Sequence, residues 1–351
     1  MTERRSSHGP KGFLGAGPEV AEVLGEPSPE LSTTEAPPVV EPSLVTVDTP
    51  APVVLPGGWK FSVPGGLLRA ARPRQWIKNV LVFAAPGAAG ISLTPGHLAP
   101  VIGAFAAWCL VSSGTYLMND ALDADADRLH PRKRLRPVAA GTVTVGTARL
   151  AGVALLVLGA GLPALWGAPR VTGILALYAV ITLSYSLWLK EMAVVDLAAV
   201  ASGFVLRAIS GGVAAHVPIS NWFLIVASFG SLFIVAGKRH AEHVDLRDGR
   251  GAHRSTLETY SLAYLGYVRA VSSGVAITAY CLWAFEKAKV ANDPVLFQLS
   301  IIPFVMALLR YALLLDAGRG GAPEEIVIGD RALQVLGLVW VGLFAAGVYA
   351  A

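Results

Sequence analysis

Residues 119–127 read Asn119-Asp120-Ala121-Leu122-Asp123-Ala124-Asp125-Ala126-Asp127 and follow directly on an apolar run from about residue 101 to 118. In a helix, Asp120, Asp123 and Asp127 fall at positions i, i+3 and i+7, so they share one face, and Asn119 lies one turn before Asp123. Like charges at these spacings repel each other and destabilise a bare helix. A hard divalent cation such as Mg²⁺ removes that repulsion and keeps coordination positions open for substrate phosphates. The stretch therefore predicts a Mg²⁺ site with Asn119, Asp120, Asp123 and Asp127 as ligands.

A basic segment follows the acidic stretch and includes Arg128, Lys133, Arg134 and Arg136. Guanidinium and ammonium groups so close to a metal site are suited to hold the rest of a polyanion that the metal binds at one end. The alternative is a charged loop that only fixes the topology of a membrane protein. The ordered spacing of the acids and the adjoining apolar run favour the binding site.

The composition places the chain in a bilayer. Of its 351 residues, 54% are hydrophobic and only 15% are charged, whereas a soluble domain carries about a quarter charged residues. The net charge of +4 is small and gives no reason to expect a nucleic-acid partner. Apolar runs long enough to span a membrane predict an all-α, polytopic membrane protein, a bundle of about nine transmembrane helices. The runs are at residues 76–91, 97–118, 147–166, 171–189, 193–214, 218–237, 262–286, 294–315 and 330–350.

The loops between these runs alternate in charge. One set is short and poor in charge, whereas the other carries the acidic and basic stretch, Lys190-Glu191 and residues 238–260 and 316–330. Because basic loops stay in the cytoplasm, we expect a multi-pass protein of the cytoplasmic (inner) membrane whose active site faces the cytoplasm. Residues 1–60, rich in Pro, Glu, Ser and Thr, predict a disordered cytoplasmic tail, which leaves residues 67–351 as the functional domain.

Three further segments bring polar residues to the same expected face. They supply Arg74 and Lys78, then Tyr185, Lys190 and Asp196, and finally Lys238 and Arg239. Cations at helix ends suit phosphate binding, although side chains that only anchor the membrane edge are the alternative. Asp196 and Arg207 are eleven residues apart and point the same way in one helix, where a functional role competes with a structural Asp–Arg pair.

The acidic stretch resembles a known signature. Asn119-Asp120-x-x-Asp123-x-x-x-Asp127, followed by Arg136-Pro137-Val138-Ala139-Ala140-Gly141, is similar to the first motif of the UbiA-type intramembrane prenyltransferase superfamily, and the resemblance covers about residues 67–351. Residues 72–79 and 185–196 look most like the branch of actinobacterial arabinan synthesis. Members of that branch transfer the 5-phosphoribosyl group of phosphoribosyl diphosphate (PRPP) to a polyprenyl phosphate such as decaprenyl phosphate. The resemblance implies this activity, with Mg²⁺ as cofactor.

The sequence departs from the superfamily pattern in one place. Aromatic prenyltransferases of the superfamily usually carry a second Asp-x-x-x-Asp motif, but here Asp196 is followed four residues later by Val200, and Tyr185 and Lys190 precede it. The loss argues against a second metal cluster of the kind that binds a prenyl diphosphate. It leaves room for a donor with an additional phosphate, which a lysine suits better than a carboxylate.

The resemblance implies a division of roles. Mg²⁺ on the acidic stretch binds the diphosphate of PRPP, and the more distant cations share the 5-phosphate. Since the acceptor is itself an ionised phosphate, Asp196 is expected to orient other groups rather than to act as a base. The expected catalytic residues are Asp120, Asp123, Asp127, Lys190 and Asp196. The expected substrate contacts are Arg74, Lys78, Arg134, Arg136, Tyr185, Lys190, Lys238 and Arg239.

Two other functions stay open at this point. One is transfer of a prenyl chain from a prenyl diphosphate to an aromatic acceptor in the same frame. The other is transport, with Asp196 and Arg207 on a translocation path, although the sequence lacks the matched broken helices of two transporter halves. The expected partners are PRPP, a polyprenyl phosphate and the bilayer, with a second copy of the chain as a further candidate. The length of the polyprenyl chain is not readable from the sequence.

Overall fold

The structure is a computed structural model, and it describes residues 62–90, 95–130, 133–247, 255–289, 291, 294–318 and 323–349. The chain divides into two units, Met1–Pro52 and Val53–Ala351, and the described fold belongs to the second. The expected tail at residues 1–60 lies outside the described residues, so its disorder stays a prediction.

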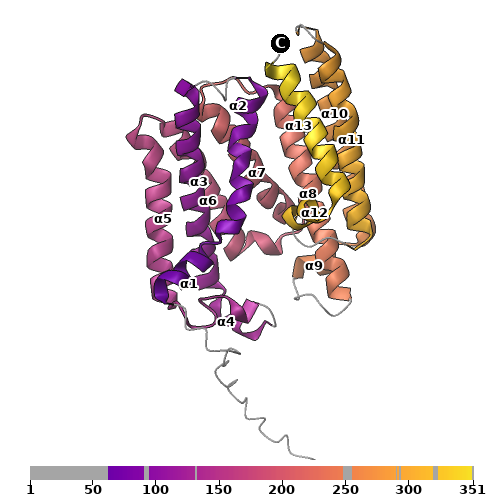
Figure 1. Ribbon diagram of the computed structural model, residues 1–351. Coiled ribbons are helices and arrows are strands. Elements are labelled where there is room, and N and C mark those ends of the chain that lie inside the picture. The colour runs from indigo at the N-terminus through magenta and orange to yellow at the C-terminus, as the bar shows by residue number, and fades with distance from the viewer. Residues whose placement is uncertain are drawn as a thin grey trace, which may run out of the picture. The chain divides into compact units, whose positions relative to one another are not determined.

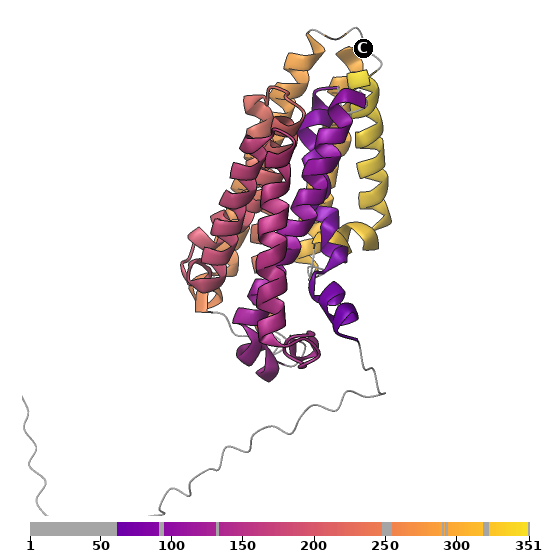
Figure 2. The same cartoon turned by 90° about the vertical axis from the view of Figure 1, so that its left-hand side faces the viewer.

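Eight helices in the described part of the chain are long and apolar enough to cross a membrane (Figure 1). Their axes are roughly aligned with one another, as the view turned by 90° shows (Figure 2). The prediction of an all-α polytopic bundle is confirmed, and no strand occurs among the described residues. The eight are α3 (Pro95–Leu122), α5 (Val145–Leu165), α6 (Pro169–Leu187), α7 (Val195–Ala214), α8 (Asn221–Arg247), α10 (Leu262–Ala288), α11 (Pro294–Asp316) and α13 (Arg331–Tyr349).

The expected first span, at residues 76–91, differs from the other eight. It consists of a 3₁₀-helix, η1 (Pro73–Phe83), continued by the short helix α2 (Ala84–Ala88). η1 packs closely on α7, where a Cβ atom built on Gly211 would lie 1.6 Å from the carbonyl oxygen of Val82. Only glycine permits the two backbones to approach in this way. The ninth segment is therefore present, but it has a different helical geometry from the one expected.

The remaining elements are short and connect the long helices. They are α1 (Val63–Ala70), α4 (Ala124–Leu129), η2 (Lys133–Leu135), η3 (Leu189–Glu191), α9 (Ser255–Thr259) and α12 (Pro323–Gly329). α1, α4 and α9 lie at the lower end of the bundle in Figure 1, and we call this the α4 end. α2 and the last turn of α13 lie at the opposite end.

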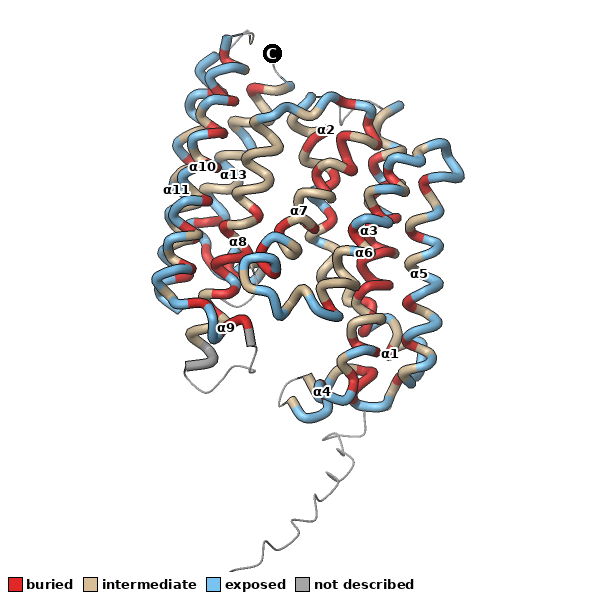
Figure 3. The backbone as a smooth tube through the Cα atoms, turned by 180° about the vertical axis from the view of Figure 1, so that it is seen from behind, coloured by how far each residue is buried: buried red, intermediate tan, exposed pale blue. Residues whose placement is uncertain are grey.

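The bundle has two halves, the first made of η1, α2, α3, α5, α6 and α7 and the second of α8, α10, α11 and α13, and α3 forms the centre of the first half. Of the eight spans it is the most enclosed, with 61% of its apolar segment buried, whereas only 11% of the α13 segment is buried (Figure 3). α3 packs against α5 at two glycines, since a Cβ atom on Gly114 would lie 2.8 Å from the carbonyl oxygen of Gly152. Small residues at such contacts let membrane helices approach closely. α7 joins this half to α8, which packs in turn on α10.

An aromatic layer holds the second half together. Rings from α10, α11 and α13 stack or tilt against one another, and the Trp340 indole N–H donates to the Tyr280 hydroxyl at 2.7 Å. Tyr280 also lies 2.8 Å from the Ser300 hydroxyl. The polar tips of these rings are thus paired with each other, which leaves their apolar faces to line the space between the two halves.

Candidate active site at the α4 end

The acidic stretch lies where α3 ends and α4 begins. Asp123 forms the bend between them, with φ −91° and ψ 7°. Its amide N–H still donates to the Asn119 carbonyl at 2.9 Å, and the Asp127 amide donates to the Asp123 carbonyl at 2.8 Å. The helical repeat therefore continues almost unbroken through the bend, and Asp120 and Asp127 stay on one side of it.

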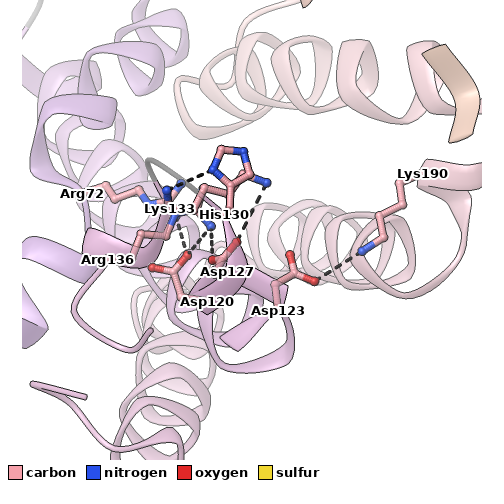
Figure 4. Close-up of polar contacts among 8 residues, drawn as sticks. All are labelled: Arg72, Asp120, Asp123, Asp127, His130, Lys133, Arg136 and Lys190. Atoms are coloured by element: carbon pink, nitrogen blue, oxygen red, sulfur yellow. Dashed lines mark hydrogen bonds and ion pairs between the residues drawn. The ribbon is translucent and has the colours of Figure 1, made fainter. Parts of the chain in front are cut away.

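Two arginines bind the buried carboxylates of this stretch (Figure 4). Arg136 Nη1 lies 3.2 Å from Asp120 Oδ1 and 2.6 Å from Asp127 Oδ2, so one guanidinium joins both acids. Arg72 Nη2 lies 2.5 Å from the same Asp120 Oδ1, and Lys133 Nζ lies 3.9 Å from Asp127 Oδ1. Arg72 directly precedes η1, and its own backbone is left-handed, with φ 54°. The site thus gathers three cations around two carboxylates.

Asp123 turns to a different partner. Its Oδ1 lies 3.4 Å from Nζ of Lys190, which comes from η3 between α6 and α7 (Figure 4). Both side chains are partly exposed. Asp125 lies away from this group, because its side chain is 94% exposed and pairs with Arg128. The bend therefore separates the four acids into a buried pair, a bridging acid and a surface acid.

The donor set at the bend fits a divalent metal ion. Asp120 Oδ2 is buried and has no hydrogen-bond partner among the described residues, and a buried carboxylate oxygen without a partner is costly. Carboxylate oxygens are the ligands that Mg²⁺ prefers. As the side chains stand, no three acidic, His or Cys groups of the described chain converge on one point. Arginines and Lys190 hold the carboxylates instead.

A second buried network surrounds Asp196 on the first turn of α7. Its Oδ2 accepts from Arg239 Nε at 2.8 Å. The same guanidinium donates to the Tyr185 hydroxyl at 2.9 Å and to Glu242 Oε2 at 2.6 Å. Arg239 is only 2% exposed, whereas Lys238 is about half exposed, with Nζ 3.8 Å from Glu242 Oε1. Arg239 is thus fully committed to neighbouring side chains, which suits a positioning residue better than a free phosphate donor.

Tyr260 completes this network from the segment between α9 and α10. Its hydroxyl donates to Asp196 Oδ1 and accepts from the backbone N–H of Val194, at 2.6 Å. Burial and the hydrogen bond to Asp196 raise the pKa of Tyr260, so its hydroxyl stays protonated as the donor. Val194 has φ 69°, a strained conformation for a β-branched residue. The Thr256 hydroxyl donates to the Lys190 carbonyl at 3.1 Å, so one segment supports both η3 and the start of α7.

Arg207 does not pair with Asp196, although the two share a helix. Its Nε donates to Asn79 Oδ1 at 2.8 Å and its Nη1 to the Gly203 carbonyl at 2.6 Å. The guanidinium also lies 4.6 Å from the ring centre of Trp108. The alternative of a structural pair between Asp196 and Arg207 is therefore excluded. Arg207 ties α7 to η1 through Asn79.

An apolar cavity of about 660 Å³ lies between η1–α2 and the aromatic layer. We call it the groove. Its lining includes Ile77, Val80 and Phe83 on one side and Trp283, Phe304 and Phe344 on the other. The groove extends along η1 and α2 away from the α4 end, as far as Ala88. At that far end a Cβ atom on Gly90 would meet Val348 at 3.1 Å, so the ends of the two walls touch.

The other expected site residues are more exposed. Arg74 and Arg134 are exposed on η1 and η2, Lys78 is partly exposed on η1, and Asn119 is partly exposed on the last turn of α3. Sequence reasoning missed Arg72 and Tyr260 as parts of the site. Arg72 stands in the basic segment before the first helix, but its left-handed backbone gives no sequence signal. Tyr260 belongs to a loop far from Asp196 in the chain, and no local pattern marks that contact.

Comparison with known proteins identifies relatives along most of the chain. A family model described as the UbiA prenyltransferase family matches residues 80–349. The decaprenyl-phosphate phosphoribosyltransferase of Mycolicibacterium smegmatis is 45% identical over 300 residues, which cover 81% of this chain and 92% of that protein. The protein of the same name from Corynebacterium glutamicum is 44% identical over 289 residues, which cover 81% of this chain and 87% of that protein.

Solved structures share the fold at much lower identity. A UbiA homolog from Archaeoglobus fulgidus bound to GPP and Mg²⁺ has a TM-score of 0.59 and 16% identity, and covers 82% of this chain and 100% of that one. The apo UbiA homolog from Aeropyrum pernix K1 has a TM-score of 0.55 and 18% identity, and covers 80% and 98%. At such identity the likeness shows the fold alone.

Proposed function

Because the chain belongs to the UbiA prenyltransferase family, we propose that it transfers the 5-phosphoribosyl group of PRPP to a polyprenyl phosphate, such as decaprenyl phosphate, and releases diphosphate. One observation carries this proposal beyond the similarity of the relatives. Lys190 lies 3.4 Å from Asp123, so a cation faces the acidic bend on the side where a second acidic motif would serve a prenyl diphosphate. PRPP has an anionic group at each end, and it needs cations besides those at its diphosphate.

The diphosphate end of PRPP fits the acidic bend. Asp120, Asp123 and Asp127, with Asn119 as a neutral oxygen donor, would hold Mg²⁺, which supplies Lewis-acid stabilisation of the leaving diphosphate when bound. Arg72 and Arg136 already lie against Asp120. Both can turn their remaining N–H groups to phosphate oxygens, because a guanidinium has five donors in a planar fork.

The 5-phosphate end fits Lys190, with Lys78 and Lys238 as further cations of the same end of the bundle. Arg239 is given a different role from the one the sequence suggests. Its guanidinium holds Asp196, Tyr185 and Glu242 in place, so it fixes the neighbouring ends of α6, α7 and α8 against one another. Asp196 likewise serves as an anchor for Arg239 and Tyr260 and accepts no proton in the reaction.

The reaction needs positioning more than proton transfer. An oxygen of the acceptor phosphate attacks C1 of the ribose, the new C1–O bond forms, and the bond from C1 to the diphosphate breaks. A phosphate monoester has a second pKa of about 6, so the nucleophile is already ionised near neutral pH and needs no general base. Alignment of the two substrates and fixed cations at the leaving group supply the acceleration.

The membrane setting follows from the same arrangement. The eight apolar spans make this a multi-pass membrane protein, and the basic residues at the α4 end support our proposal that this end faces the cytoplasm. We place the protein in the inner membrane on this argument. The groove, which is apolar along its length, accommodates the polyprenyl tail. We further propose that the reaction belongs to the synthesis of cell-wall arabinan precursors.

A donor comparison with purified protein tests the proposal. The parent protein, given polyprenyl phosphate, should consume PRPP with Mg²⁺ present and lose this activity in EDTA, whereas a prenyl diphosphate with an aromatic acceptor should give no product. Lys190→Ala should lower kcat/KM for PRPP roughly tenfold to a hundredfold, because a charge-assisted phosphate contact is lost. A PRPP analogue without the 5-phosphate should respond little to this change. Activity with the prenyl diphosphate alone would establish the aromatic prenyltransferase instead.

A further inference from the structure

η1 has three residue rows, because a 3₁₀-helix has three residues per turn and its side chains at i and i+3 eclipse. One row faces the interior. Asn79 and Val82 are fully buried, and the Trp76 indole N–H donates to the Ser113 hydroxyl of α3 at 3.0 Å. The other two rows therefore lie to either side of this buried row.

A second row runs along the groove. Ile77, Val80 and Phe83 are spaced three residues apart and all line it, whereas the third row contributes only Leu81 from within η1. The residue that precedes them in the same row is Arg74. Arg74 and Phe83 are nine residues apart, which in an α-helix would put them on about opposite faces, at 100° per residue. In the 3₁₀ geometry of Pro73–Phe83 they return to the same face. The unusual helix type therefore aligns a guanidinium with an apolar wall.

Arg74 stands at the α4 end of this row. Arg72, two residues before it, contacts Asp120. The row from Arg74 to Phe83 is about 18 Å long at a rise of about 2 Å per residue. Arg74 is exposed and has no hydrogen-bond or ion-pair partner within the described residues, in contrast to Arg72, Arg136 and Arg239. A free cation at the end of a long apolar row matches a ligand with one anionic head and a long apolar tail.

We propose that Arg74 binds the phosphate of the polyprenyl phosphate acceptor while Ile77, Val80 and Phe83 contact its first isoprene units. This inference rests on the proposed function and assigns the acceptor's head group within it. Arg72 then serves the donor, and Arg74, two residues later, serves the acceptor. The acceptor oxygen is delivered next to the diphosphate site, and a polyprenyl alcohol without the phosphate is not held there.

Kinetics with two substrates separate this role from others. Arg74→Ala should lower kcat/KM for polyprenyl phosphate about tenfold to a hundredfold, the value of a charge-assisted contact, and leave the KM for PRPP within about twofold of the parent value. Arg74→Lys should show a smaller loss than Arg74→Ala, because lysine keeps the positive charge but lacks the planar fork of arginine. Arg149→Ala is the matched control, because Arg149 is also exposed, near the start of α5, and should leave both parameters unchanged.

A groove variant tests the alignment of head and tail. Val80→Trp narrows the groove at a side chain that is already half exposed, so the protein should fold. This variant should bind a long-chain polyprenyl phosphate more weakly but should bind a phosphate with a single isoprene unit as the parent does. Arg74→Ala should weaken the binding of both. An unchanged acceptor KM in Arg74→Ala, as expected if Arg74 only anchors ordinary phospholipid, overturns the inference, and so does an equal rise in the KM for PRPP. Failure of the parent protein to consume PRPP would instead refute the proposed function.

Discussion

Asp120 has an uneven environment for a buried carboxylate. Arg72 and Arg136 both bind its Oδ1, while its Oδ2 has no partner in the described chain. Asp127 shares Arg136 with it, and Asp123 is held by Lys190. The acids of this stretch thus differ in burial and in partner although their spacing in the sequence is regular. Their individual contributions should differ accordingly.

Substitution of single acids should reveal this difference. Asp120→Ala or Asp127→Ala should lower kcat by roughly a hundredfold or more, because each removes a group that would hold the metal at the leaving diphosphate. Asp125→Ala should stay within about twofold of the parent, as expected for an exposed surface acid. Turnover measured over a range of Mg²⁺ concentrations, with a thermal melt of each variant, checks both statements. Equal losses at Asp125 and Asp127 would contradict the assignment.

At the scale of elements, the sequence predicted where the helices lie along the chain better than it predicted their local geometry. Apolar runs located the long helices, because a bilayer requires about 20 such residues in a row. The 3₁₀ form of η1 was not predicted, because an apolar run marks a span but carries no signal of helix type, and the close contact between Gly211 and Val82 joins residues far apart in the chain. The acids of the stretch were expected to share one helical face, but the chain bends at Asp123 and gives them different partners. Asp196 and Arg207 were expected to point the same way in one helix, and the sequence did not show that Asp196 is held by Arg239 and Tyr260 from distant segments.

The contact between η1 and α7 should be sensitive to a single methyl group. Gly211→Ala places a Cβ where the Val82 carbonyl oxygen lies, so η1 must move and the protein should lose roughly 1–3 kcal/mol or more of stability. Gly173→Ala is the control, because a Cβ on this exposed glycine of α6 meets nothing within 4 Å. It should gain up to about 1 kcal/mol from helix propensity. Thermal unfolding in detergent compares the two, and equal Tm values would show that η1 yields without strain.

Across the whole molecule, the two sides of the site are built from different elements of the bundle. The donor side is built from α3, α4, η2 and η3, and the proposed acceptor side from η1 and the aromatic layer. These parts are far apart in the sequence. The bundle brings them together, so the sequence could name most of the polar residues but not say which of them meet.

Removal of residues 1–60 tests where the function resides. The truncated protein should insert into membranes and keep kcat/KM within about twofold of the parent, because this segment lacks an apolar face to add to the bundle. A longer deletion that also removes Arg72 should abolish activity, since it takes away a cation of the acidic bend. Activity assays on equal amounts of inserted protein make the comparison. A large loss in the shorter deletion would place a function in the tail.

Arg72 and Arg136 both hold Asp120, and Arg136 also holds Asp127, which has a consequence for the order of binding. A cation that enters alone competes with these arginines for the carboxylates and meets the repulsion of two positive groups. A cation that arrives with diphosphate brings the anion to which both arginines can turn. Metal and diphosphate should therefore bind cooperatively, and linkage requires that each raises the affinity of the other by the same factor. Calorimetric titration of Mg²⁺ with and without inorganic diphosphate measures that factor directly, and in Arg136→Ala the factor should fall toward one.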